Sequence, residues 1–121
     1  MIFRKRDWSL VTSFKYASRG LRDALREETN LRIHLLVAVT ALILAGYLRF
    51  NFLEWIILIL TISLVFSLEL INTTLETLTD IVSPEIKEKA RIAKDVSAAG
   101  VMLAAFTAVI IGALLYLPKI L

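Results

Sequence analysis

Three long apolar stretches alternate with short polar segments along the chain. The stretches cover residues 31–49, 54–79 and 94–118, and the second one has no charged side chain between Glu54 and Glu69. A bilayer core of roughly 30 Å requires about 20 helical residues, which each stretch supplies together with its flanks. The pattern therefore predicts three transmembrane helices, with a polar loop over residues 80–93 between the second and the third.

The composition agrees with a location in the membrane. Apolar residues make up 58% of the 121 residues, more than a small soluble domain with its large surface can hide. The chain has no cysteine and a single histidine, which excludes disulfides and cysteine nucleophiles and argues against a multi-histidine metal site. We expect one domain, residues 1–121, and no nucleic-acid partner.

Basic residues are distributed unequally between the segments that flank the apolar stretches. Seven lie in residues 1–30 and four in residues 87–94, whereas the other two flanks contain only Arg49 and Lys119. Cytoplasmic segments of membrane proteins carry an excess of Lys and Arg. We therefore expect the N-terminus and the loop before the third helix in the cytoplasm, and the C-terminus outside.

Residues 8–28 have the pattern of a helix that lies on the membrane surface. Basic residues recur at helical spacing on one side and apolar residues on another: Lys15, Arg19, Arg22 and Arg26 against Leu10, Phe14, Leu21 and Leu25. Such a helix contacts anionic headgroups, although the basic residues could also serve only as topology signals. The predicted fold class is all-α integral membrane, with an amphipathic surface helix and three transmembrane helices.

Carboxylates appear where the second helix should still be inside the membrane. One helical face carries four polar residues at spacings i, i+3, i+7 and i+11: Glu69, Asn72, Glu76 and Asp80. The apolar run over residues 55–68 spans about 21 Å, so Glu69 lies within the membrane near its cytoplasmic side. Asn72 and Thr73 alone could hold helices together, but three acids are costly there. This face therefore predicts a functional site.

Other candidate residues flank this face in the sequence. Glu28 falls on the apolar side of the surface helix, and with Glu76 it could hold Mg²⁺ through oxygen ligands; alternatively, the helix ends before it. Lys94 could neutralise a nucleotide phosphate with Asp95 orienting it, or the two could be a membrane anchor and a helix cap. His34 is interpreted as a packed or headgroup-level residue without a catalytic role.

Four blocks of sequence carry a resemblance to a known family: ELINTTLETLTD (69–80), FKYASRGLRDALREETNLRIHL (14–35), SPE (83–85) and AKDVSAAGVML (93–103). With these blocks in order, the chain resembles the prokaryotic diacylglycerol kinase family of small trimeric membrane enzymes along essentially its whole length. The phosphate-loop and protein-kinase motifs of other nucleotide-dependent enzymes are absent from the sequence.

The resemblance implies a homotrimer with active sites shared between subunits, which transfers the γ-phosphate of ATP to a lipid hydroxyl. Position by position, it implies that Glu69 is the general base facing the lipid and that Glu28 and Glu76 are Mg²⁺ ligands. It also implies a set of nucleotide-binding residues: Tyr16, Asn72, Glu85, Lys87, Lys94 and Asp95. Ser9 replaces an arginine of the diacylglycerol kinase branch, and we assign it no role.

The run NLRIHLLVA, which contains His34, is more similar to the Gram-positive branch of the family, most of whose members are undecaprenol kinases. We therefore expect undecaprenol as the acceptor, with diacylglycerol as the alternative, and a multi-pass protein of the bacterial cytoplasmic membrane. A non-catalytic adaptor or a cation transporter is less favoured, because residues 55–68 offer almost no polar path across the membrane.

Overall fold

The computed structural model describes residues 9–85 and 87–121, which form four α-helices joined by short connections. The helices are α1 (Leu10–Glu27), α2 (Thr29–Tyr47), α3 (Phe52–Val82) and α4 (Glu88–Ile120). Trp8, the first residue of the predicted surface helix, lies outside the described residues. Three of the helices are long and apolar enough to cross a membrane, which confirms the all-helical membrane fold.

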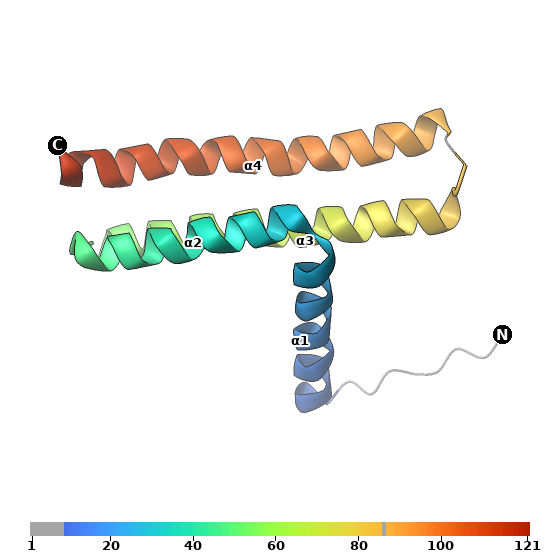
Figure 1. The fold of residues 1–121 in the computed structure, drawn as a ribbon, viewed down its shortest axis with the longest axis horizontal. Helices are drawn as coiled ribbons and strands as arrows, with labels where there is room; N and C mark the ends of the chain where they lie inside the picture. The colour runs from blue at the N-terminus through green and yellow to red at the C-terminus, as the bar shows by residue number, and fades with distance from the viewer. Residues whose placement is uncertain (1–8, 86) are drawn as a thin grey trace.

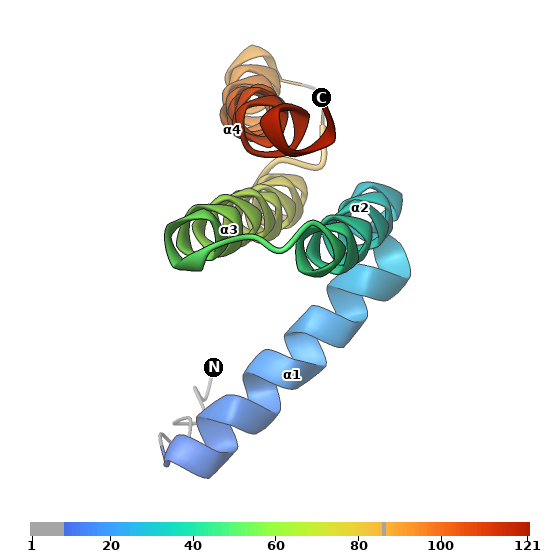
Figure 2. The same ribbon diagram turned by 90° about the vertical axis from the view of Figure 1, so that its left-hand side faces the viewer.

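The three long helices lie side by side, and α1 runs across their direction (Figure 1). Seen along their length, α2, α3 and α4 occupy the corners of a triangle, and α1 passes across the side of α2 and α3 that faces away from α4 (Figure 2). This arrangement is compatible with a surface helix attached to a membrane bundle, and the membrane-surface position of α1 stays a prediction.

The helices α3 and α4 are longer than a membrane core requires. Their 31 and 33 residues correspond to about 46 and 50 Å at about 1.5 Å per residue, against a hydrocarbon core of roughly 30 Å. Both continue past the start of α2 at their connected end (Figure 1). Much of the predicted 80–93 loop is therefore helical, and only the residues between Val82 and Glu88 connect the two helices.

Local chemistry explains these helix ends. The residues up to Val82 contain no helix breaker, and α3 stops where Ser83 precedes Pro84, because a residue before proline is disfavoured in the α conformation. The first turns of α4 are stabilised by Arg91, whose guanidinium pairs with both Glu88 and Asp95. An acidic residue in the first turn is also favourable at the positive end of the helix dipole.

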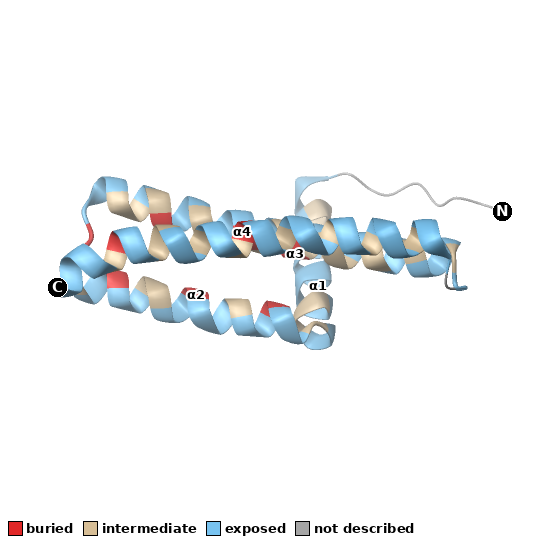
Figure 3. Cartoon of the chain, turned by 90° about the horizontal axis from the view of Figure 1, so that it is seen from above, coloured by how far each residue is buried: buried red, intermediate tan, exposed pale blue. Residues whose placement is uncertain are grey.

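The hydrophobic core lies at the other end of the bundle, next to the α2–α3 turn. Its buried side chains come from α2, the turn, α3 and α4: Ala45, Phe50, Leu58 and Leu115. Figure 3 shows buried positions near this turn and along the facing sides of the helices. Two polar contacts add to the packing: the Tyr116 hydroxyl donates to the Ala41 carbonyl, and Lys119 pairs with Glu54 at 3.0 Å. This end of the bundle is consequently the more firmly held.

We expect Asn51→Ala to lower the free energy of unfolding by about 1 kcal/mol, the usual effect of removing an N-cap side chain. Asn51 and Glu54 form a reciprocal capping box at the start of α3, with both hydrogen bonds at 2.9 Å. Thermal unfolding in detergent measures the change. The matched control is Asn30→Ala, since Asn30 is exposed in the first turn of α2; equal stability of the two variants would contradict the capping role.

The corner between α1 and α2 is formed by one residue. Glu28 has an extended backbone (φ −104°, ψ 107°) and is the C-cap of α1 and the N-cap of α2. The Arg32 side chain reaches back to donate to the Leu25 and Arg26 carbonyls at 3.3 and 2.8 Å, which satisfies acceptors that the end of α1 leaves open. The predicted surface helix thus ends at Glu27, and Glu28 itself lies at the corner between α1 and α2.

Candidate active site

The acidic face of α3 contains a buried carboxylate. Glu69 is 6% exposed and is the one buried charged side chain among the residues that the structure describes. Its Oε2 atom has no hydrogen-bond partner within the described part of the chain, and Thr73 donates to the backbone carbonyl of Glu69. An unsatisfied buried acceptor costs about 1–3 kcal/mol. The fold therefore holds a reactive oxygen that its own groups do not satisfy.

The next turns of the same face carry Asn72 and Glu76, which are both half-buried. The Asn72 amide donates to Glu76 Oε1 at 3.2 Å, and this bond orients the Glu76 carboxylate. The amide oxygen of Asn72 is buried and, like Glu69 Oε2, has no partner among the residues that the structure describes. Both oxygens can accept a hydrogen bond or bind a cation, and the Glu69 carboxylate can also take a hydroxyl proton.

Glu28 and His34 approach this face from the α1–α2 corner and the start of α2. The ionisable side chains near enough to interact electrostatically with the Glu69 carboxylate are His34, Glu28 and Glu76. The structure thus brings together the three carboxylates that were predicted to form the site. Within the described ranges, no group of three or more metal-ligating side chains forms a complete metal site, so a cation here would need ligands from a substrate as well.

Lys94 is held toward the acidic face from α4. It forms an ion pair with Asp80, and it also interacts with the charge of Glu76. Asp95, by contrast, pairs with Arg91 at 2.7 Å. The sequence suggested that Asp95 orients Lys94, but in the structure Asp80 does so. Asp95 pairs with Arg91 because it lies four residues after Arg91 on the same helix face.

Three predicted nucleotide-binding residues lie far from Glu69 within one chain. Tyr16 lies on α1 about 18 Å before Glu28 along the helix axis at about 1.5 Å per residue, and its ring faces the Arg19 guanidinium at 5.5 Å. Glu85 and Lys87 are exposed in the α3–α4 connection, about 20 Å along the helix axis from Glu69 at about 1.5 Å per residue. One chain alone does not bring these residues to the carboxylate site.

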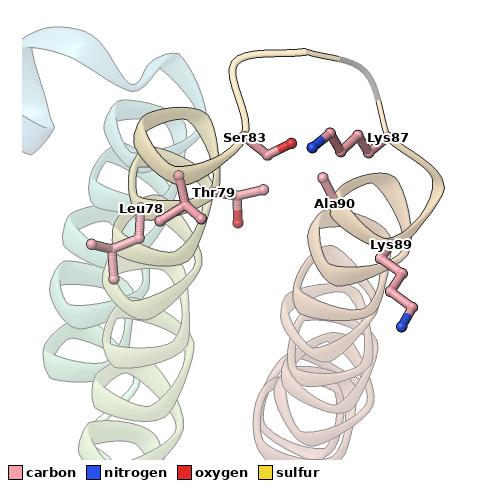
Figure 4. Close-up of a pocket in the computed structure, with 7 residues that line it drawn as sticks. Leu78, Thr79, Ser83, Lys87, Lys89 and Ala90 are labelled. Carbon is pink, nitrogen blue, oxygen red and sulfur yellow. The ribbon is translucent and has the colours of Figure 1, made fainter.

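Lys87 lines a separate pocket of about 460 Å³ between the ends of α3 and α4. In Figure 4, the side chains of Ser83 and Lys87 point toward one another at the top of the gap between the helices, and Lys89 points away. The pocket offers the Lys87 ammonium at the connected end of the bundle, whereas the Thr79 and Ser83 hydroxyls that line it already donate to the Leu75 and Glu85 carbonyls. The ammonium is suited to an anionic ligand.

Comparison with known proteins identifies the family of the chain. The family model of prokaryotic diacylglycerol kinase matches residues 15–116. The chain belongs to the prokaryotic diacylglycerol kinase family. This membership confirms the predicted resemblance and the prediction that the chain is an integral membrane lipid kinase. At the level of the family, a lipid and ATP are the substrates.

Individual relatives of this diacylglycerol kinase family member carry two different names. A diacylglycerol kinase of Synechocystis is 41% identical over 123 residues, which cover 98% of this chain and 70% of the relative. An undecaprenol kinase of Bacillus subtilis is 37% identical over 108 residues, covering 89% and 88%. A diacylglycerol kinase of Haemophilus influenzae is 35% identical over 95 residues, covering 78% and 80%.

Two residues near the site carry more weight in the structure than in the sequence. Asp80 is the partner of Lys94, and the sequence indicated a role for Asp80 only through its position on the same helical face as Glu69. His34 lies on the inward face of α2, as its spacing from the buried residues Leu31 and Ala38 indicates. A single histidine at helical spacing from apolar residues is typical of a packed side chain, so the sequence alone did not indicate a functional role for His34.

Proposed function

We propose that this chain is an ATP- and Mg²⁺-dependent undecaprenol kinase, a single membrane kinase domain over residues 1–121. The observation that carries the proposal is Glu69, a buried carboxylate in a membrane-spanning helix with an oxygen that no group of residues 9–85 and 87–121 satisfies. A general base needs a free acceptor where the substrate hydroxyl arrives. Membership in a lipid kinase family supports the same reaction.

In the proposed reaction, Glu69 accepts the proton of the lipid hydroxyl while the hydroxyl oxygen bonds to the γ-phosphorus of ATP. The bond between that phosphorus and the β–γ bridging oxygen breaks, and ADP leaves with the electron pair. The proton on Glu69 then passes to water. Phosphoryl transfer depends mainly on positioning and charge neutralisation, so a site of a few carboxylates and a lysine is sufficient.

Glu28 and Glu76 are the proposed ligands of Mg²⁺. Both are half-buried, both act on the charge of Glu69, and the Asn72 amide fixes the direction of the Glu76 carboxylate. Mg²⁺ typically binds one or two carboxylates plus substrate phosphates and water, so a two-carboxylate set without further protein ligands fits this ion. When bound, Mg²⁺ neutralises part of the phosphate charge.

The proposed nucleotide site includes Lys94 and the Asn72 face, together with the residues that lie far away within one chain. We propose a homotrimer in which neighbouring subunits complete the site with three residues: Tyr16, Glu85 and Lys87. The exposed small residues of α4, Ala98, Ala99 and Gly100, support close packing between helices of different subunits. Asp95 is assigned to the same site from the family resemblance alone, since in the structure it pairs with Arg91.

The orientation that we propose places α1, the α3–α4 connection and the active site in the cytoplasm of a bacterial cell, and the C-terminus outside the cytoplasmic membrane. The basic residues of α1 and of the α4 start support it. On α1 they are all exposed: Lys15, Arg19, Arg22 and Arg26. A helix that crosses the direction of the bundle can lay these residues against anionic headgroups.

Undecaprenol is the proposed acceptor because the run around His34 resembles the branch that contains undecaprenol kinases, and the B. subtilis relative has that name. The second candidate is diacylglycerol, which the Synechocystis relative at 41% identity favours. Each lipid offers one hydroxyl near the interface. They differ in the two ester groups that diacylglycerol carries beside its hydroxyl and undecaprenol lacks.

A side-by-side assay of the purified protein with labelled ATP distinguishes the two acceptors. We expect undecaprenol to be phosphorylated with a kcat/KM at least about ten-fold higher, because ester groups that enter an apolar span without partners lose their hydration. A reaction without lipid is the control. A higher kcat/KM for diacylglycerol would reverse the choice of acceptor, and transfer to neither lipid would refute the proposed kinase function.

A further inference from the structure

An apolar cavity of about 370 Å³ lies between α2, α3 and α4. This volume is within the range of about 300–1,000 Å³ that small-molecule sites occupy. Its walls are aliphatic and aromatic side chains of the three helices, with three exceptions that carry polar groups: His34, Thr61 and Tyr116. A ligand in this space would be a hydrocarbon with few polar atoms.

Two of the three polar groups are already engaged. The Thr61 hydroxyl donates to the Ile57 carbonyl at 2.7 Å, and the Tyr116 hydroxyl donates to the Ala41 carbonyl. His34 is half-buried and makes no hydrogen bond or ion pair within the part of the chain that the structure describes. A neutral imidazole has one N–H donor and one acceptor nitrogen, so His34 is the polar group of the cavity that remains available.

His34 also lies at the end of the cavity closest to the catalytic carboxylate. The α3 wall includes Val65, which is buried, and Glu69 follows one helical turn later on the same face. Tyr116, in contrast, belongs to the opposite end of the bundle, beside the hydrophobic core. The cavity thus leads from the apolar end of the bundle toward the proposed base.

We propose that His34 positions the acceptor lipid: its ring N–H donates a hydrogen bond to the lipid hydroxyl oxygen, directing the hydroxyl proton at Glu69, while the adjoining hydrocarbon chain fills the cavity. This inference rests on the proposed lipid kinase function and assigns its substrate class. His34 keeps its proton throughout, and the transferred proton goes to Glu69.

The balance of polar groups selects the class of lipid. One available donor in an apolar cavity matches an alcohol whose only polar atom is its hydroxyl oxygen, as in a prenol. The ester carbonyls of a diacylglycerol would find no free donor among the cavity residues, since Thr61 and Tyr116 donate to the backbone. Each buried acceptor without a partner weakens binding.

The test compares His34→Phe and His34→Gln with the wild-type protein, using undecaprenol and ATP. We expect His34→Phe to lower kcat/KM for the lipid about ten-fold, the effect of one lost hydrogen bond, with KM for ATP unchanged. His34→Gln retains an N–H donor and should stay within about three-fold of wild type. Thr40→Val is the matched control, because Thr40 is exposed on α2 and its hydroxyl donates to Leu36.

Three outcomes would overturn the inference. The first is a lipid kcat/KM of His34→Phe that equals the wild-type value while the wild-type protein phosphorylates undecaprenol. The second is an equal loss for lipid and ATP in both variants, which would mean that His34 only supports the fold. The third is a change in oligomeric mass without a change in lipid KM, which would mean that a second copy of the chain occupies the cavity. A wild-type protein inactive on every lipid alcohol would instead refute the proposed function.

Discussion

Glu69→Gln should lower kcat for lipid phosphorylation by about 10²–10⁴-fold, the range over which a positioned general base accelerates reactions. The substitution keeps the size of the side chain and removes the carboxylate that accepts the proton. ATP binding should persist, because Asn72, Glu76 and Lys94 are unchanged. Transfer of labelled phosphate to the lipid, measured with saturating ATP and lipid, gives the result directly.

The same position should show a gain in stability. Glu69 Oε2 is buried without a partner in the described ranges, so Glu69→Leu removes an unsatisfied acceptor and should raise the free energy of unfolding by about 1–3 kcal/mol. Loss of activity together with higher stability separates a catalytic role from a folding defect. Glu88→Gln is the control, since Glu88 is exposed and pairs with Arg91. Wild-type turnover of Glu69→Gln would contradict the assignment of the base.

Glu76→Gln is the second substitution with a large expected effect. Glutamine can still accept the hydrogen bond that Asn72 donates at 3.2 Å, so the variant removes charge while the local geometry persists. We expect the Mg²⁺ concentration for half-maximal activity to rise by at least about 10–100-fold. Mutation of residues that only hydrogen-bond to metal ligands already lowers metal affinity by this factor, and Glu76 is a proposed direct ligand. Titration of activity with Mg²⁺ at fixed ATP measures the shift.

Glu28→Gln should behave in the same way, and Glu27→Gln provides its matched control. Glu27 is the last residue of α1 and is exposed, whereas Glu28 is half-buried at the corner. An unchanged Mg²⁺ requirement in Glu76→Gln and Glu28→Gln would show that the metal is held elsewhere. Partial recovery of both variants at high Mg²⁺ would support the two-carboxylate site.

The membrane helices and the acidic face followed from the sequence because both are periodic signals. The spacing of Glu69, Asn72 and Glu76 fixes their common face in any helix, and the apolar run before Glu69 fixes its depth. The lengths of α3 and α4 did not follow, because hydropathy marks where a helix is apolar and not where it ends. Pro84 and the charge pairs of Arg91 determine those ends.

Contacts between helices were the less predictable part of the site. The pairing of Lys94 with Asp80 joins α4 to α3, whereas the sequence suggested the neighbouring Asp95. The relation of His34 to Glu69 depends on how deeply α2 sits beside α3, which no spacing within α2 encodes. The position of Glu28 depends on the corner that Arg32 stabilises, and this contact joins two helices that the sequence treats separately.

The continuation of α3 and α4 beyond the start of α2 determines where the reaction product first acquires its charge. A lipid phosphate carries one to two negative charges, and drawing a charge through hydrocarbon costs several kcal/mol or more. In the proposed reaction, Glu69 is predicted to lie near the cytoplasmic end of the apolar run of α3, so we expect the new phosphate to form close to the surrounding headgroups. The product can diffuse sideways into the bilayer with its charge hydrated throughout, so its departure requires no opening of the firmly packed end of the bundle.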